Sequence, residues 1–113
     1  GWLTTIALTD IHPAVKAISP QASPSDMFIG DDFYHNGAFR LAPSFGYAAM
    51  MERSKENFPF DFEDEDVYDF YLNLGPLSNV NKQHFAGDVP TWNDFMNHSS
   101  YDQFWKEKDR RIV

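Results

Sequence analysis

The sequence has 113 residues, a formal net charge of −8 at pH 7 and no cysteine; 42% of its residues are hydrophobic and 17% are aromatic. The length fits one small domain, and the negative charge argues against nucleic acid or anionic lipid as a partner, since both attract basic surfaces. The lack of cysteine excludes disulfides, zinc–thiolate sites and a cysteine nucleophile.

The first segment has apolar residues at a helix-like spacing: Trp2, Leu3, Ile6 and Ala7. This pattern predicts a helix over residues 2–9, which ends by His12 because the residue before a proline avoids helical geometry. Residues 15–18 (VKAI) then predict a short strand. No other segment offers it a clear partner, although a strand needs neighbours for its backbone hydrogen bonds.

The middle of the chain alternates between loop and helix signals. Residues 20–37 are rich in Pro, Ser, Gly and Asp, which predicts a loop. Residues 38–53 predict a helix, in which Pro43 either bends the helix or opens its main part. Residues 57–66 predict an acidic connection.

The C-terminal half predicts short helices. An apolar stripe at i, i+3, i+4 and i+7 predicts a helix over residues 67–74, which Gly75 and the following proline end. Three further short helices are expected after Asn79, Thr91 and Ser100, each of which could cap the turn that follows it.

Residues 30–40 combine several chemically useful groups. Asp31 and Asp32 are adjacent carboxylates, and His35 lies three residues further on. In a loop, both carboxylates could face one cavity and attract an ammonium group; equally, they could cap a turn, where Asp is common after Gly. His35 is open to the same two interpretations, a pocket residue or a structural one.

Other chemistry has no support in the residue pattern. There is no G-x-S-x-G elbow for a serine nucleophile, and no two histidines are spaced as metal ligands on a helix. A glycine-rich phosphate loop is also lacking. We therefore predict no catalytic residue, no metal site and no cofactor within these 113 residues.

Five segments together resemble one family, the X-Pro dipeptidyl-peptidase-like serine hydrolases. This family includes cocaine esterase, the α-amino acid ester hydrolases and the glutaryl-7-aminocephalosporanic acid acylases. The segments are residues 1–4 (GWLT), 12–18 (HPAVKAI), 20–24 (PQASP), 30–39 (GDDFYHNGAF) and 98–105 (HSSYDQFW). The resemblance is greatest to the α-amino acid ester hydrolase branch, while residues 57–66 and 77–88 match no pattern of the family.

The resemblance implies a mainly α fold, the helical cap segment of an α/β-hydrolase. Residues 1–20 would belong to the hydrolase core, as the helix after the nucleophile elbow and one short orphan strand. Residues 21–113 would form the cap, with an active-site loop at 26–40. Gly1 resembles the last glycine of the family's G-x-S-Y-x-G elbow, so nucleophile, acid and base would all lie outside these residues. The chain alone is then expected to be inactive.

The resemblance also implies a role for the acidic pair. The ester hydrolase branch binds the α-ammonium group of its substrate with a carboxylate cluster, and one member of that cluster corresponds to Asp32, with Asp31 beside it. The candidate walls of the pocket are His35, Asn36, Tyr34 and Trp2. The expected substrate is a small acyl ester or amide, or a short peptide.

Two alternatives remain at this point: a self-contained acidic helical interaction module without a catalytic role, and a dipeptidyl-peptidase rather than an ester hydrolase. Members of the ester hydrolase branch are often exported, so the resemblance favours a periplasmic or secreted location. Exposed apolar faces would make the chain self-associate.

Overall fold

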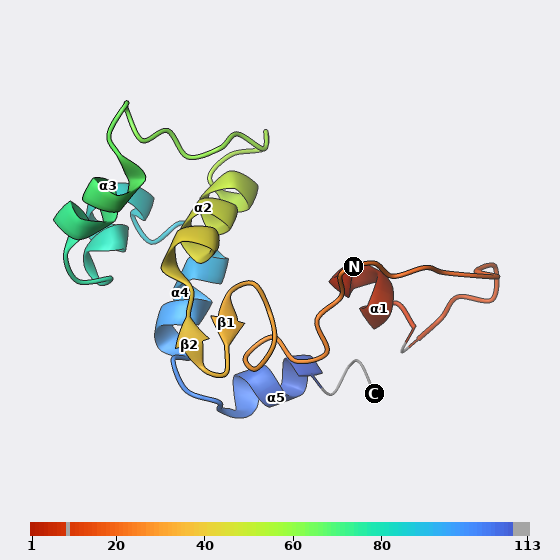
Figure 1. Ribbon diagram of the computed structural model, residues 1–113. Helices are drawn as coiled ribbons and strands as arrows, with labels where there is room; N and C mark the ends of the chain where they lie inside the picture. Colours follow the sequence, from red (N-terminus) through yellow and green to blue (C-terminus); the bar gives the residue numbers. More distant parts are fainter. Residues whose placement is uncertain (9, 110–113) are drawn as a thin grey trace. The chain divides into compact units, whose positions relative to one another are not determined.

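The computed structural model describes residues 1–8 and 10–109 (Figure 1). The chain divides into two compact units, one made of residues 1–40 with the segment that starts at Ser100, and the other of residues 41–99. The described part is mainly helical, which confirms the expected fold class. The division into residues 1–20 and 21–113 stays a prediction.

The first unit is built around a two-stranded antiparallel hairpin. Its elements are α1 (Trp2–Ile6), β1 (Tyr34–His35), β2 (Ala38–Phe39) and α5 (Gln103–Asp109). Tyr34 pairs with Phe39 in the hairpin register. Asn36 and Gly37 form its two-residue turn with φ angles of 49° and 80°, as type I′ turns require. The loop predicted to run to residue 37 is therefore wrong, because the Asn-Gly pair makes a hairpin.

Stacked aromatic rings form the core of the first unit. The ring of Phe28 lies 4.8 Å from that of Tyr34 and 5.5 Å from that of Trp105, between ring centroids. Asp26 fixes the start of this loop, since its Oδ1 accepts hydrogen bonds from the N–H groups of Phe28 and the next residue, both at 2.8 Å. The hydroxyl of Tyr101 donates to the other oxygen of Asp26 at 2.9 Å. This bond joins the two chain segments of the unit, residues 1–40 and the segment that starts at Ser100.

Residues 15–18 do not form the predicted strand. Among the described residues the strands are β1 and β2, with one isolated bridge between Gly30 and His35. A strand requires a hydrogen-bonded neighbour, and none reaches residues 15–18 in the described part of the chain. The apolar pattern is present but unpaired, with the side chain of Val15 41% exposed.

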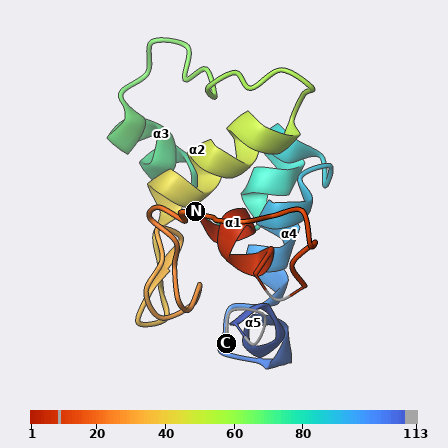
Figure 2. The same ribbon diagram turned by 90° about the vertical axis from the view of Figure 1, so that its right-hand side faces the viewer.

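The second unit consists of four helical elements (Figures 1 and 2). They enclose one cluster of aromatic rings. They are α2 (Leu41–Glu52), α3 (Val67–Leu74), the π-helix η1 (Asn81–Phe85) and α4 (Pro90–Asn97). Phe45 is fully buried at the centre of the cluster, and its ring lies within 6.1 Å of six others, between centroids. These six are the rings of Phe60, Phe70, Tyr71, His84, Phe85 and Trp92.

Helix α2 starts later than predicted, because residues 38–39 pair in the hairpin. Pro43 lies in its first turn, where a backbone N–H has no helical partner in any case, so it opens the helix and does not bend it. Helix α3 has the predicted bounds. Asp66 caps it by accepting from the N–H of Tyr68 at 2.8 Å, and Gly75 ends it with φ 70°.

None of the three predicted caps is observed, and two of the helices have a different capping side chain. Asn79 does not cap the helix after it; its Nδ2 donates to the carbonyl of Leu74 at 2.9 Å, at the end of α3. Asp102, and not Ser100, caps α5 by accepting from the N–H of Phe104 at 3.0 Å. The start of α4 receives its acceptor from Glu52 of α2.

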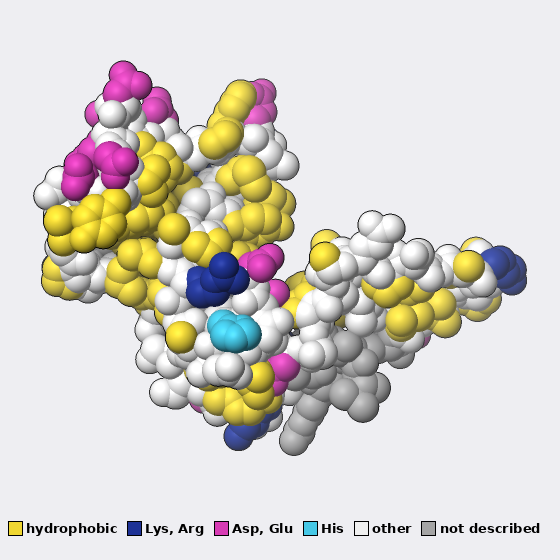
Figure 3. Space-filling model, viewed as in Figure 1, with side chains coloured by type: hydrophobic (Ala, Val, Ile, Leu, Met, Phe, Trp, Pro, Cys, Tyr) yellow, Lys and Arg dark blue, Asp and Glu magenta, His cyan; other side chains and the backbone are white. Residues whose placement is uncertain are grey.

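The surface of the second unit combines acidic and apolar groups. Acidic side chains gather around the segment that leads into α3, with hydrophobic side chains exposed beside them (Figure 3). This acidic segment includes Glu63 and Asp64, whose φ angles are 54° and 66°. No helix in the described residues is both long and apolar enough to cross a membrane.

Candidate functional site

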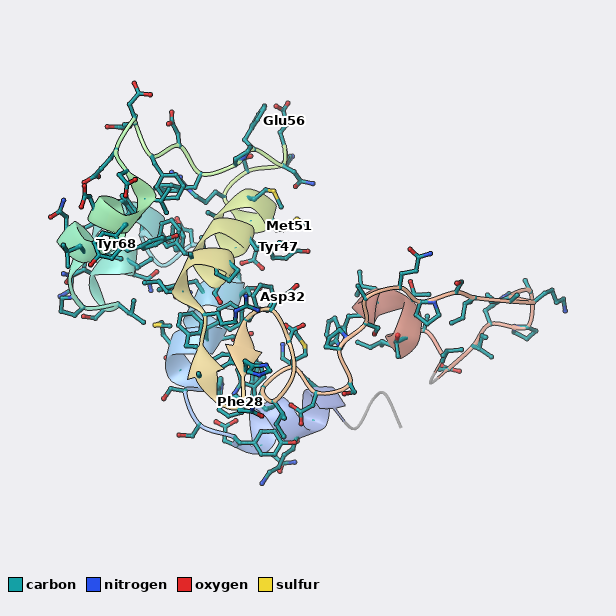
Figure 4. All side chains as sticks on the ribbon, in the orientation of Figure 1. Phe28, Asp32, Tyr47, Met51, Glu56 and Tyr68 are labelled. Carbon is teal, nitrogen blue, oxygen red and sulfur yellow. The ribbon has the colours of Figure 1, made fainter. Side chains whose placement is uncertain are left out.

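An open hollow of about 380 Å³ lies in the first unit, beside β1. Its walls come from two short segments and one arginine: Ala22, Ser23, Pro24, Gly30, Asp31, Asp32, His35 and Arg40. Figure 4 shows Asp32 at one end of the loop before β1 and Phe28 at the other. Three of the predicted site residues, Asp31, Asp32 and His35, therefore share one surface.

Backbone hydrogen bonds hold the acidic turn in place. The N–H of Asp31 donates to the carbonyl of Tyr34 at 3.0 Å, and the N–H of Arg40 donates to the carbonyl of Phe33 at 2.9 Å. The first bond closes a tight turn over Asp32, and the second places Arg40 across from that turn. The hairpin thus brings residues eight positions apart to the same hollow.

Asp31 is the less exposed of the two carboxylates. Burial raises the pKa of its carboxyl group, while hydrogen bonds from the N–H groups of Asp32 and Phe33 act in the opposite direction. The negative charge of Asp32 raises the pKa of Asp31 further, and the positive charge of Arg40 lowers it. A partly dehydrated carboxylate gains more from a nearby cation than a fully hydrated one does.

Asp32 is highly exposed and forms an ion pair with Arg40. The Nη1 atom of Arg40 lies 3.7 Å from Oδ1 of Asp32, and the two side chains are 52% and 89% exposed. A single contact of this length between exposed groups is weak, on the order of 0–1 kcal/mol. Sequence reasoning missed Arg40 as a site residue, although it directly follows Phe39; the Asn-Gly turn was the signal that could have placed it.

The other predicted wall residues lie elsewhere. Tyr34 is 2% exposed, its ring packs in the core of the first unit, and burial raises the pKa of its hydroxyl. Asn36 is exposed in the hairpin turn. Trp2 lies on α1, half-buried, and its Nε1 has no acceptor within the described residues. None of the three lines the hollow; their roles in a binding pocket stay predictions.

Helix α1 is attached to one wall of the hollow. The hydroxyl of Thr5 donates to the hydroxyl of Ser23 at 2.7 Å. Gly1, just before α1, packs so closely that an added Cβ would lie 2.1 Å from the carbonyl oxygen of Gln21. Only glycine fits there, since a backbone carbonyl cannot move aside as a flexible side chain would. No group of three His, Asp or Glu side chains that could hold a metal ion occurs among the described residues.

Comparison with known proteins decides the family. The sequence model of the X-Pro dipeptidyl-peptidase (S15) family matches residues 1–112. The chain belongs to the X-Pro dipeptidyl-peptidase (S15) family. Its resemblance to X-Pro dipeptidyl-peptidase-like hydrolases is thereby confirmed at the level of the family.

A solved structure resembles this S15 family chain closely. It is the crystal structure of an aminopeptidase from a Thaumarchaeota archaeon of marine sediment, with 34% sequence identity and a TM-score of 0.81. The match covers 94% of this chain and 18% of the aminopeptidase, so the chain spans about a fifth of that protein's length. The comparison with curated proteins finds no match.

Proposed function

We propose that this chain supplies the amine-binding part of an S15-family serine hydrolase that cleaves esters or amides of α-amino acids. The observation that carries the proposal is the convergence of Asp31 and Asp32 on one hollow, with His35 beside them. Membership of a peptidase family and the similarity to an aminopeptidase support it, because the free amino group of a peptide is an ammonium ion near neutral pH.

Two adjacent carboxylates provide what an ammonium group needs. Charge-assisted hydrogen bonds from an ammonium to carboxylate oxygens are stronger than those between neutral groups. Asp31 contributes a partly dehydrated oxygen, and Asp32 contributes an exposed one that a ligand can reach. Fixing the ammonium also fixes the neighbouring carbonyl carbon, and such positioning lowers the barrier of an acyl transfer.

The chain contributes binding and enclosure to this reaction, and not bond cleavage. Its 113 residues contain no G-x-S-x-G elbow. A helical cap over a serine nucleophile would exclude water and shape the acyl pocket. The aromatic cluster of the second unit gives such a cap a buried, packed interior. A self-contained acidic interaction module, the alternative from sequence, would not require a family match over residues 1–112.

The proposal is tested by titrating the ¹⁵N-labelled chain with two matched ligands. Phenylalanine amide carries the α-ammonium group, and 3-phenylpropionamide has the same shape without it. We expect amide resonances of residues 30–35 to shift with the first ligand only. Asp32→Asn should weaken that binding about two- to five-fold, the effect of an exposed charge pair. Asp88→Asn, an exposed aspartate of the second unit, is the control.

Equal binding of the two amides, or shifts confined to other residues, would refute an amine-binding hollow. A second experiment addresses the class of substrate. An S15 protein that contains this chain together with its catalytic residues should hydrolyse α-amino acid esters faster than des-amino esters. The opposite ranking of amino acid esters and Xaa-Pro amides would favour a dipeptidyl-peptidase instead.

A further inference from the structure

The hollow presents both signs of charge, which an ammonium site alone does not require. Arg40 lines it together with Asp31 and Asp32, and its guanidinium lies 3.7 Å from the carboxylate of Asp32. A ligand that carries only a positive charge would meet attraction from the two aspartates and repulsion from Arg40. A ligand with a negative group beside its ammonium can direct the ammonium to the aspartates and the negative group to Arg40, so that Arg40 attracts part of the ligand.

The pair between Arg40 and Asp32 can open for such a ligand. Both side chains are more than half exposed, and one contact at 3.7 Å joins them. Exposed pairs with this geometry contribute little stability, so their replacement by two new pairs has a low cost. The guanidinium is also well suited to the task, because its planar donors match the two oxygens of a carboxylate.

We propose that the hollow binds a free α-amino acid as a zwitterion, with the ammonium on Asp32 and Asp31 and the carboxylate on Arg40. The two charged groups of an α-amino acid are attached to one carbon atom, so they match a guanidinium and a carboxylate that are neighbours. In a peptide the termini are further apart, by up to about 3.3–3.6 Å per residue when extended. The site therefore favours a single amino acid over a peptide.

The ammonium half of this inference rests on the proposed function, and the carboxylate half goes beyond it. A hydrolase of α-amino acyl esters or amides releases the free α-amino acid as its product. Arg40 would then hold the product more tightly than the substrate, since the carboxylate appears only after the acyl group has been released to water. Arg40 would thus be a specificity-determining residue for product retention.

The test compares phenylalanine with phenylalanine amide in ¹⁵N titrations of the full 113-residue chain. At a pH at which both α-amino groups are protonated, the two ligands differ only in that a neutral amide replaces the carboxylate. We expect phenylalanine to bind about two- to five-fold more tightly, the range of an exposed ion pair. Arg40→Gln should make the two affinities equal, and Arg40→Lys should retain part of the difference. Arg53→Gln removes the same charge from the second unit and should leave the preference unchanged.

The outcomes separate this inference from the proposed function. Equal affinity of the chain for phenylalanine and its amide would overturn zwitterion binding, yet leave the amine site in place if the amide still binds better than 3-phenylpropionamide. A preference that persists in Arg40→Gln would also overturn it. Failure of all three ligands to bind would refute both. The comparison of ligands on the unaltered chain, and the Arg40→Lys variant, decide the matter even if Arg40→Gln does not fold.

Discussion

The carboxylate of Glu52, at the C-terminal end of α2, caps α4 through Thr91. Its Oε2 accepts a hydrogen bond from the backbone N–H of Thr91 at 2.9 Å, and its Oε1 accepts one from the hydroxyl of Thr91 at 2.5 Å. The residue directly before α4 is Val89, whose side chain cannot cap. A residue 39 positions away thus takes over the capping of this helix and joins α2 to α4.

Removing this carboxylate should destabilise the second unit. We expect Glu52→Ala to lower the free energy of unfolding by about 1–2 kcal/mol, because the N–H and hydroxyl of Thr91 lose a shared acceptor. Denaturant unfolding followed by tryptophan fluorescence would measure it, since Trp92 is buried next to Thr91. Glu56→Ala is the matched control, because no hydrogen bond or ion pair of the Glu56 side chain occurs within the described residues. A loss equal to that of the control would contradict the assignment.

Replacement of glycine by alanine should have opposite effects on stability at two positions, one in the hairpin turn and one inside α2. Gly37 has φ 80°, and a Cβ there would lie 3.1 Å from Cε1 of Phe28. Gly37→Ala should therefore destabilise the chain by more than about 1 kcal/mol. Gly46 lies inside α2, where an added Cβ would meet no atom within 4 Å apart from the nearby backbone of the helix itself, so Gly46→Ala should stabilise the chain by about 0.5–1 kcal/mol. Thermal unfolding would measure the change in stability of each variant. Changes of the same sign would show that backbone conformation does not determine the effect of the substitution.

Local signals in the sequence predict α3 to the residue. The apolar stripe, the acidic residues before it and Gly75 after it all lie within one continuous segment. The helix predicted over residues 38–53 is too long at its start. Residues 38–39 have a composition that a helix also tolerates, but they form strand β2. The Asn36–Gly37 pair carried the missing information, as a two-residue turn that favours hairpins.

Long-range relationships could not be predicted in this way. The capping of Thr91 by Glu52 depends on how α2 and α4 pack, and nothing in the sequence near either residue indicates it. The grouping of Asp31, Asp32 and His35 could be predicted, because these residues are close in the sequence and a turn brings such residues together. Tyr34 belongs to the same stretch but points into the ring core, since successive residues of a strand face opposite sides.

His84 makes stability depend on pH. Its ring packs against Phe60 and Phe70, with centroid distances of 5.7 and 5.2 Å, and burial together with the charge of Arg53 lowers the pKa of His84 below 6.5. The unfolded chain therefore binds a proton at a higher pH than the folded chain does. The stabilisation that the folded chain gains from unprotonated His84 is complete above about pH 6.5. It is lost as the pH falls through the lower pKa that His84 has in the folded chain.

We expect the free energy of unfolding to decrease as the pH is lowered from 7.5 to 5.5. His84→Phe keeps a ring in the cluster but removes the proton site, so its pH dependence should be flatter by no more than about 1.4 kcal/mol per pH unit. His12→Gln, which removes an imidazole at an exposed position, is the matched control. Parallel curves for the original chain and His84→Phe would contradict this role.

The exposed face of α3 should make the chain self-associate. Tyr68, labelled in Figure 4, and Leu72 lie four residues apart on this helix and are 73% and 64% exposed. Adjacent apolar side chains lose unfavourable contact with water when two copies meet. The net charge of −8 opposes this contact, so association should increase with salt, which screens the repulsion.

Static light scattering over a range of protein concentrations would measure the association at 0.05 M and 0.5 M salt. These two salt concentrations change the Debye length severalfold. The double variant Tyr68→Glu with Leu72→Glu should shift the mean mass toward the monomer at both salt concentrations. Ser78→Glu with Gln83→Glu adds the same charge at exposed polar positions, and should reduce association less. If both double variants act equally, net charge and not the apolar face of α3 governs association. A monomer at every concentration and salt would show that this face does not bind a second copy.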